Sequence, residues 1–160
     1  QLVIGDALAV CLLELKGFSS KDFAKYHPGG SLGKKLYLKV RDLSSVNQKP
    51  QVTINAPLKD VIIEISKKML GVTAVVENEK IIGIITDGDL RRMLKDNTDI
   101  SALLAKDIMG KKPKTISVDA MAIQALETME NNNITQILVE DNSKYVGVVH
   151  LHDLLKEGIF

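Results

Sequence analysis

Two short polar segments contain residues whose types and spacing could do chemistry. One is Thr86-Asp87-Gly88-Asp89 with Arg92, and the other is His150-Leu151-His152-Asp153. We call residues 86–92 the first elbow and residues 150–156 the second elbow. Each elbow follows an apolar run typical of a strand and begins a helical pattern. A first-turn carboxylate is well placed to hold a ribose diol, while neighbouring amides and a hydroxyl face a phosphate.

The same spacing has a purely structural interpretation. Thr86 and Asp89 fit a capping box, with Thr86 at the N-cap and Asp89 in the first helical turn. In the second elbow the N-cap position is His150, a residue type that is a poor N-cap, yet the carboxylate is retained as Asp153. A carboxylate retained without its capping partner suggests a second role. The alternative for His150 and His152 is a surface pair with no function.

An internal repeat organises the chain from residue 40 onward. Thr73 aligns with Thr135, 62 positions later, whereas Asp89 aligns with Asp153, 64 positions later. We therefore expect a two-residue insertion in the second hairpin turn, at residues 140–143. Each copy is expected to run strand, helix, strand, strand, helix, over 52–54, 57–70, 72–76, 81–85 and 87–95, then over 114–116, 120–132, 134–139, 145–149 and 151–156.

The expected fold class is α/β (α+β), with two β-α-β-β-α repeats packed as a pseudo-twofold pair. One unit cannot cover both faces of a three-stranded sheet, so we expect two units to stack sheet to sheet through their helices. We assign residues 1–38 to the C-terminal helices of a truncated preceding domain. Residues 40–98 form repeat one and residues 105–158 form repeat two.

The first 38 residues contain an unusually apolar helical pattern. Asp6 can cap a helix over residues 7–16 that Gly17 closes. This helix is apolar nearly all round and would need a large partner surface, so we expect Cys11 to be buried in packing. Ser19 or Ser20 can then cap a short helix over residues 21–26, which Pro28 stops.

Composition excludes several classes of function. Lys plus Arg number 21 against 20 for Asp plus Glu, and the resulting formal net charge of +1 is too small to attract nucleic acid. No apolar run reaches the roughly 18 residues of a membrane span. The first residues also lack the basic segment of a signal peptide. A single cysteine allows no internal disulfide, and we expect no metal site. These features favour a cytoplasmic protein without a membrane partner.

The two units resemble cystathionine-β-synthase-type (CBS) domains, whose repeats carry a Gly-h-h-Thr/Ser-x-x-Asp motif and pair into a nucleotide-binding module. Gly83 to Asp89 matches this motif at every defined position, whereas His150 departs from it. The resemblance implies that Thr86 contacts phosphate and Asp89 contacts ribose. It also implies that Thr53 and the Val72-Thr73-Ala74 backbone line a base pocket. The remaining expected ligand-site residues are Arg92, Thr135, His150, His152 and Asp153, of which the two histidines suit a more acidic ligand.

The N-terminal residues add a second likeness. Gly5-Asp6-Ala7-Leu8-Ala9-Val10 and His27-Pro28-Gly29-Gly30-Ser31-Leu32-Gly33 resemble the end of the sugar-isomerase domain in D-arabinose 5-phosphate isomerases. That family joins one such domain to a CBS pair. It interconverts D-ribulose 5-phosphate and D-arabinose 5-phosphate, which feeds 3-deoxy-D-manno-octulosonate of lipopolysaccharide or capsule. The rest of the family's active site would lie upstream of Gln1, so this chain alone is expected to be inactive.

His27 matches the active-site histidine of that family. A side chain of near-neutral pKa on a rigid turn suits proton transfer or ring opening. The alternative is a histidine that ends a helix and binds a carbonyl group.

Three hypotheses of function follow. The chain is the regulatory CBS pair of an arabinose 5-phosphate isomerase, a stand-alone adenine-nucleotide sensor, or a dimerisation unit with empty pockets. Under the first hypothesis no cofactor is required. The effector is a nucleotide or nucleotide-sugar, for example the cytidylate-linked octulosonate. We also expect a homo-oligomer, a dimer of CBS pairs that becomes a tetramer in the full-length parent.

Overall fold

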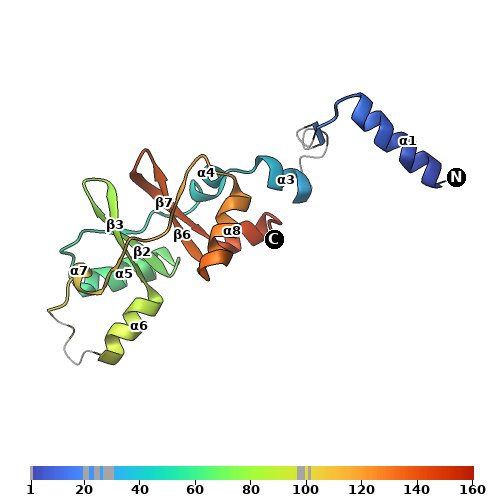
Figure 1. The fold of residues 1–160 in the computed structure, drawn as a ribbon. Coiled ribbons are helices and arrows are strands. Elements are labelled where there is room, and N and C mark those ends of the chain that lie inside the picture. The colour runs from blue at the N-terminus through green and yellow to red at the C-terminus, as the bar shows by residue number, and fades with distance from the viewer. Residues whose placement is uncertain (1, 20–21, 24–25, 27–30, 97–99, 101) are drawn as a thin grey trace.

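Two copies of one strand–helix–strand–strand–helix order follow one another along the chain (Figure 1). The computed structural model describes residues 2–19, 22–23, 26, 31–96, 100 and 102–160. The first copy contains β1 (Gln51–Val52), α5 (Leu58–Lys68), β2 (Val72–Glu77), β3 (Lys80–Thr86) and α6 (Asp87–Asp96). The second contains β5 (Thr115–Ser117), α8 (Ala122–Asn132), β6 (Gln136–Asp141), β7 (Lys144–His150) and α9 (Leu151–Lys156). The expected order of elements is confirmed, with small shifts at their ends.

The two copies keep one constant spacing of 64 residues from β1 to α9. Val75 pairs with Gly83 and Val139 pairs with Gly147, so Val139 is the counterpart of Val75. Each hairpin turns through two residues of positive φ, which the twist of a two-residue turn requires: Asn78 and Glu79, then Asn142 and Ser143. The expected insertion at residues 140–143 is therefore wrong. That expectation matches Thr73 with Thr135 by residue type, whereas Thr73 pairs with Ile85 and its counterpart in the second copy is Ile137, which pairs with Val149.

Each copy builds a small sheet in which the first strand is parallel to the second and the second is antiparallel to the third. The second sheet has the order β5-β6-β7. The first sheet gains a fourth strand, β4 (Gly110–Lys111), which comes from the connector and pairs with β3 through Gly83 and Ile84. The sequence does not predict β4, because two residues are too few to show a strand period.

Two short helices exchange places between the copies. α4 (Val40–Ser44) precedes the first copy but packs on the second: the Val40 N–H donates to the Ala120 carbonyl at 2.9 Å, and Val40 is buried among α8 residues. α7 (Ala105–Ile108) precedes the second copy but packs on the first, where the Ala105 N–H donates to the Ala56 carbonyl at 2.9 Å. The domain boundaries 1–38, 40–98 and 105–158 stay a prediction. Across these boundaries, α4 packs on the second repeat and α7 packs on the first.

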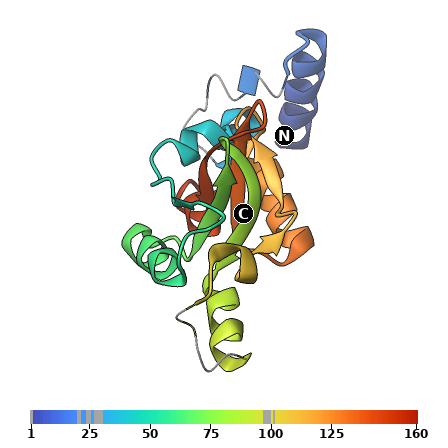
Figure 2. The same cartoon turned by 90° about the vertical axis from the view of Figure 1, so that its left-hand side faces the viewer.

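The two sheets pack directly against each other. Val72 and Ala74 of β2 share one buried cluster with Leu138 of β6 and with Tyr145 and Val148 of β7. Figures 1 and 2 both show the green strands of the first copy beside the red strands of the second. Burying one Val or Leu side chain contributes about 1.5–3 kcal/mol. The expectation that helices join the sheets is therefore wrong, because apolar strand residues already cover these two faces.

α1 (Leu2–Leu15) lies apart from the pair in Figure 1 and buries none of its residues. Cys11 is exposed, so its expected burial is wrong: no described element covers this helix. The expected cap at Asp6 is also wrong, since the helix already begins at Leu2 and continues through Asp6. Its end is confirmed at Gly17, where φ is 60°. None of the helices in the described residues could cross a lipid bilayer.

α3 (Ser31–Tyr37) connects the N-terminal part to the pair. Lys34 forms an ion pair of 2.7 Å with Glu157, just after α9, and the Lys35 Nζ donates to the Phe160 carbonyl at 2.5 Å. α3, which precedes both copies in the sequence, therefore contacts the C-terminal end of the second copy.

Tyr145 provides a test of the contact between the sheets. Its side chain is buried, and its hydroxyl donates to the Pro50 carbonyl of the other repeat at 2.8 Å. Tyr145→Phe keeps the ring but leaves this buried carbonyl without its donor, so we expect the free energy of unfolding to fall by about 1–2 kcal/mol. Urea denaturation measures the loss. Tyr26→Phe, at an exposed tyrosine, is the control, and equal losses in both variants would contradict this role for the hydroxyl.

Candidate functional site

The first elbow is a hydrogen-bonded cluster at the start of α6. The Thr86 N–H and Oγ1 both donate to Asp89 Oδ2, at 2.8 and 2.6 Å, and the Asp89 N–H donates to Thr86 Oγ1 at 3.3 Å. Arg92 donates to Asp89 Oδ1 at 2.6 Å. Partial burial opposes ionisation of Asp89, but the hydrogen bonds from Thr86 and the charge of Arg92 outweigh it and lower the pKa of Asp89. Asp89 is therefore a stable carboxylate with three donors.

The same bonds occur where no ligand site is expected. The Ser19 N–H and Oγ donate to Asp22 Oδ2 at 2.8 and 2.6 Å, and the Asp22 N–H donates to Ser19 Oγ at 3.3 Å. This arrangement also confirms Ser19 as the expected cap in that segment. The capping-box interpretation of Thr86 and Asp89 thus describes their geometry completely. A ligand-binding role must rest on other features.

The second elbow is capped as well. His150 Nδ1 accepts from the His152 N–H at 3.0 Å, and the His150 N–H donates to Asp153 Oδ2 at 2.9 Å. His150 is therefore a working N-cap, and the inference that Asp153 had lost its capping partner is wrong. The imidazole nitrogen supplies the acceptor that a hydroxyl supplies in the first elbow.

Asn47 joins the second elbow from a distant part of the sequence. Its Nδ2 donates to Asp153 Oδ2 at 2.6 Å and to the Val148 carbonyl at 3.0 Å. Asn47 follows α4, and the exchange of α4 onto the second repeat brings it here. The sequence analysis missed Asn47, because nothing in its neighbours shows that this segment crosses to the other repeat.

A cavity of about 380 Å³ opens at the second elbow. Its described lining comes from both repeats: Asn47, Met69, Leu70, His150, His152, Asp153 and Lys156. The rings of His150 and His152 meet edge to face with centroids 4.8 Å apart. Burial lowers the pKa of His150, and the neighbouring His152 and Lys156 add to this against the opposing charge of Asp153. Of these residues, His150, His152 and Asp153 were predicted from the sequence, whereas Asn47, Lys156 and the two residues just after α5 were not.

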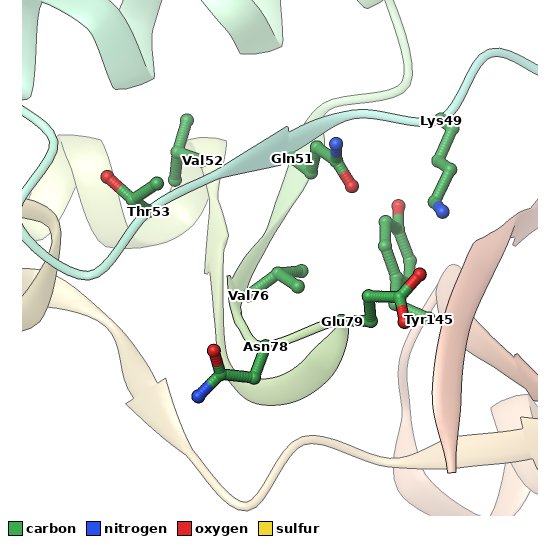
Figure 3. A pocket seen from close by; sticks show the side chains of 8 residues that line it. All are labelled: Lys49, Gln51, Val52, Thr53, Val76, Asn78, Glu79 and Tyr145. Carbon is green, nitrogen blue, oxygen red and sulfur yellow. The ribbon is translucent and has the colours of Figure 1, made fainter.

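Thr53 lines a different cavity, of about 360 Å³, at the tip of the first hairpin (Figure 3). Its other described lining residues are Lys49, Gln51, Val52, Val76, Asn78, Glu79 and Tyr145. Lys49 Nζ lies 5.1 Å from the centroid of the Tyr145 ring, within cation–π range. Only Thr53 in this set was expected from the sequence.

The other expected residues are distributed as follows. Val72 and Ala74 lie between the sheets, and Thr73 is fully buried, so their side chains do not line the cavity with Thr53. Thr135 is exposed just before β6, where its carbonyl accepts from the Leu151 N–H at 2.8 Å. The assignment of these residues to a base pocket stays a prediction. His27 lies outside the described residues. No group of three or more metal-ligating side chains occurs in the part of the chain that the structure describes.

The capping role of His150 predicts a dependence of stability on pH. The pKa of His150 is lowered in the folded state, so the unfolded chain takes up the proton first. Stability is full above the unfolded pKa of about 6.5 and falls as pH drops through this value toward the folded pKa. Protonation of Nδ1 would also remove the acceptor for the His152 N–H.

We expect His150→Thr, which copies Thr86, to reduce this acid-induced loss while staying within about 1 kcal/mol of the parent near pH 8. His150→Ala should lose about 1 kcal/mol near pH 8, because it removes the cap. Urea denaturation at a series of pH values measures both effects. An unchanged pH dependence in His150→Thr would contradict the assignment.

Comparison with known proteins places these features in a family. The family model described as CBS domain matches residues 40–96 and 105–159, which include both elbows. Arabinose 5-phosphate isomerase KdsD from Francisella tularensis is 48% identical over 157 residues, covering 97% of this chain and 48% of that protein. The KdsD of Yersinia pestis is 42% identical over 160 residues, covering 99% and 49%. The chain thus spans about half the length of these relatives.

Solved structures share the fold. A CBS domain protein from Pyrobaculum aerophilum, complexed with AMP, superposes with a TM-score of 0.66 at 21% identity, over 73% of this chain and 90% of that chain. A protein with CBS domains from Burkholderia ambifaria gives a TM-score of 0.65 at 24% identity, over 75% and 90%. Together with the two matched ranges, this architecture shows that the chain belongs to the CBS-domain family and carries its domains as a tandem pair.

Proposed function

We propose that this chain is the CBS-pair portion of an arabinose 5-phosphate isomerase and that the pair binds a nucleotide or nucleotide-sugar effector of that enzyme. The observation that carries the proposal is the 41–48% identity, over nearly the whole chain, to proteins named arabinose 5-phosphate isomerase KdsD. The match includes residues before the first repeat, which a free-standing CBS pair does not need. The parent enzyme would interconvert D-ribulose 5-phosphate and D-arabinose 5-phosphate.

The cellular role follows from that reaction. D-arabinose 5-phosphate would supply 3-deoxy-D-manno-octulosonate for lipopolysaccharide or capsule. The cytidylate-linked octulosonate, an end product of such a pathway, is then a reasonable feedback effector. We place the protein in the cytoplasm as a homo-oligomer, a dimer of CBS pairs and a tetramer in the full-length parent.

Two features of the pair support a small-molecule effector. The cavities of about 360 and 380 Å³ fall in the size range of small-molecule sites. The cavity at the second elbow is lined by residues of both repeats, so a ligand there contacts residues far apart in the sequence, such as Met69 and His152.

The second candidate is an adenine-nucleotide-sensing module without enzymatic activity. It is favoured by the Pyrobaculum aerophilum CBS domain protein, which has the same fold and was solved with AMP. Ligand preference separates the two candidates: an adenine nucleotide as the preferred ligand favours this module, and the cytidylate-sugar favours the isomerase effector.

Calorimetric titration of the chain with AMP, ATP and the cytidylate-linked octulosonate tests effector binding. We expect one of these ligands to bind, and Asp89→Asn to weaken binding in the first elbow by about 1–3 kcal/mol because a ribose hydroxyl exchanges a charged acceptor for a neutral amide. Asp22→Asn is the matched control, since it removes a carboxylate with the same capping bonds.

Two outcomes would contradict the proposal. No heat with any of the three ligands would exclude sensing. A loss of stability in both variants with unchanged affinity would leave Asp89 as a helix cap only.

We further expect residues 1–160 alone to show no turnover of D-ribulose 5-phosphate, because the chain spans about half the length of the isomerases that it resembles. A coupled assay for D-arabinose 5-phosphate measures this, with the KdsD of Yersinia pestis as the positive control. Turnover above the background rate would show that this half carries the catalytic groups.

A further inference from the structure

The two elbows carry equivalent charges that are paired differently. At the constant spacing of 64 residues, Asp89 corresponds to Asp153 and Arg92 corresponds to Lys156. In the first elbow the cation is bound by the carboxylate, because Arg92 and Asp89 form an ion pair of 2.6 Å. In the second elbow Asp153 Oδ2 instead accepts from the neutral amide of Asn47 at 2.6 Å.

This difference originates in the segments that follow the exchanged helices. After α7, the chain forms β4 and pairs with β3 through the backbone. After α4, the backbone does not form the corresponding strand, and the Asn47 side chain donates to the Val148 carbonyl in its place. Asn47 is thereby directed at Asp153.

The Lys156 ammonium group consequently has no hydrogen-bond or ion-pair partner among the residues that the structure describes, and it lines the second-elbow cavity. The same cavity holds the imidazoles of His150 and His152, whose side-chain type changes charge between about pH 5 and 8. The carboxylate in this cavity is that of Asp153, whose Oδ2 already accepts from the Asn47 amide and the His150 N–H. When both imidazoles are protonated, this one negative charge is outnumbered by three positive ones.

We propose that the second-elbow cavity binds an anionic oxygen group, a phosphate ester or a carboxylate, through Lys156 and the imidazoles of His150 and His152, and that this binding strengthens as pH falls. Charge-assisted hydrogen bonds from ammonium and imidazolium groups are the strong contacts for such anions. Within the proposed function, the cavity receives the acidic part of the effector. The first elbow, where Asp89 neutralises Arg92, lacks this pH-dependent preference.

The groups that face His150 support the direction of this effect. On α9 they are His152, Asp153 and Lys156, and Asp153 is the sole carboxylate among the described residues that line the cavity. The facing segment after α4 contributes the neutral Asn47, and the segment just after α5 contributes Met69 and Leu70. An anion that enters therefore meets more positive than negative side chains once an imidazole is protonated.

Sulfate is a suitable probe, because its charge does not change over the pH range of interest. The experiment follows the amide signals of residues 150–156 by nuclear magnetic resonance during sulfate titration at about pH 5.5 and about pH 8. We expect sulfate to bind at least about fivefold more tightly at the lower pH, equivalent to about 1 kcal/mol. Lys156→Gln should weaken binding at both values, and the double variant His150→Thr, His152→Gln should remove the pH dependence.

Arg92→Gln is the matched control, because it removes the corresponding cation of the first elbow and should leave sulfate binding at the second unchanged. Equal affinity at both pH values would overturn the proposal. So would unchanged affinity in Lys156→Gln, or signal changes confined to residues 86–92. Circular dichroism of each variant verifies that it is folded.

The source of the anion is distinguished by two further titrations, with cytidine monophosphate and with gluconate, a sugar carboxylate. Tighter binding of the nucleotide identifies a phosphate ester, and tighter binding of gluconate identifies a carboxylate. If sulfate binds as expected but AMP, ATP and the cytidylate-sugar do not, the effector proposal fails and the anion site stands. If those effectors bind but their affinity does not change with pH, the effector proposal stands and the pH-dependent anion site fails.

Discussion

Direct packing of one sheet on the other is the constraint on which the pair depends. The contact is built from Val72, Ala74, Leu138, Tyr145 and Val148, and its one polar group, the Tyr145 hydroxyl, is satisfied by a carbonyl of the other repeat. A buried contact of this kind tolerates no change in strand register, because a shift by one residue would turn polar side chains into it. It also places the segment just after α5 next to the second elbow, so that Met69 and Leu70 complete a cavity with His150. The candidate site is therefore a product of how the repeats pack.

Capping chemistry and ligand chemistry use the same residue types here, and the structure separates them only partly. Ser19 with Asp22 and Thr86 with Asp89 make the same hydrogen bonds, although only the second pair lies in a CBS repeat. The feature that distinguishes the second elbow is its surroundings. It has a cavity, two imidazoles, an unpaired lysine and a carboxylate held by Asn47. A motif of four residues is thus less informative about binding than the charges that its neighbours leave unpaired.

Most of the fold could be predicted from the sequence, because it depends on local patterns. Apolar alternation and amphipathic periods gave the order of the ten main elements, and the positive φ of Gly17 follows from its residue type. The features that sequence analysis missed depend on contacts between distant segments. These are β4, the exchange of α4 and α7, and the direct contact of the sheets. The spacing between repeats was misjudged because Thr73 and Thr135 are identical residues in different backbone positions.

Part of the candidate site at the second elbow could likewise be predicted from the sequence. His150, His152 and Asp153 could be selected because they share one short segment, and the cavity brings them together. Asn47 and Lys156 could not be, since an exposed lysine and an asparagine between a helix and a strand have no distinguishing pattern. The role of His150 as a cap also required coordinates, because it depends on which ring nitrogen points at the His152 N–H.

The exchanged helices bear on the ancestry of the chain. A polypeptide with a single repeat would hold its leading helix away from its own core, and it would expose the surface that Val40 and Ala105 now fill. Two copies of that polypeptide could close both cores by trading their leading helices, as in a domain-swapped homodimer. Fusion of two such copies would preserve every exchanged contact and a nearly uniform spacing between equivalent residues. The tandem chain has the form expected of a swapped dimer that became a single polypeptide, and its two pockets were then able to diverge.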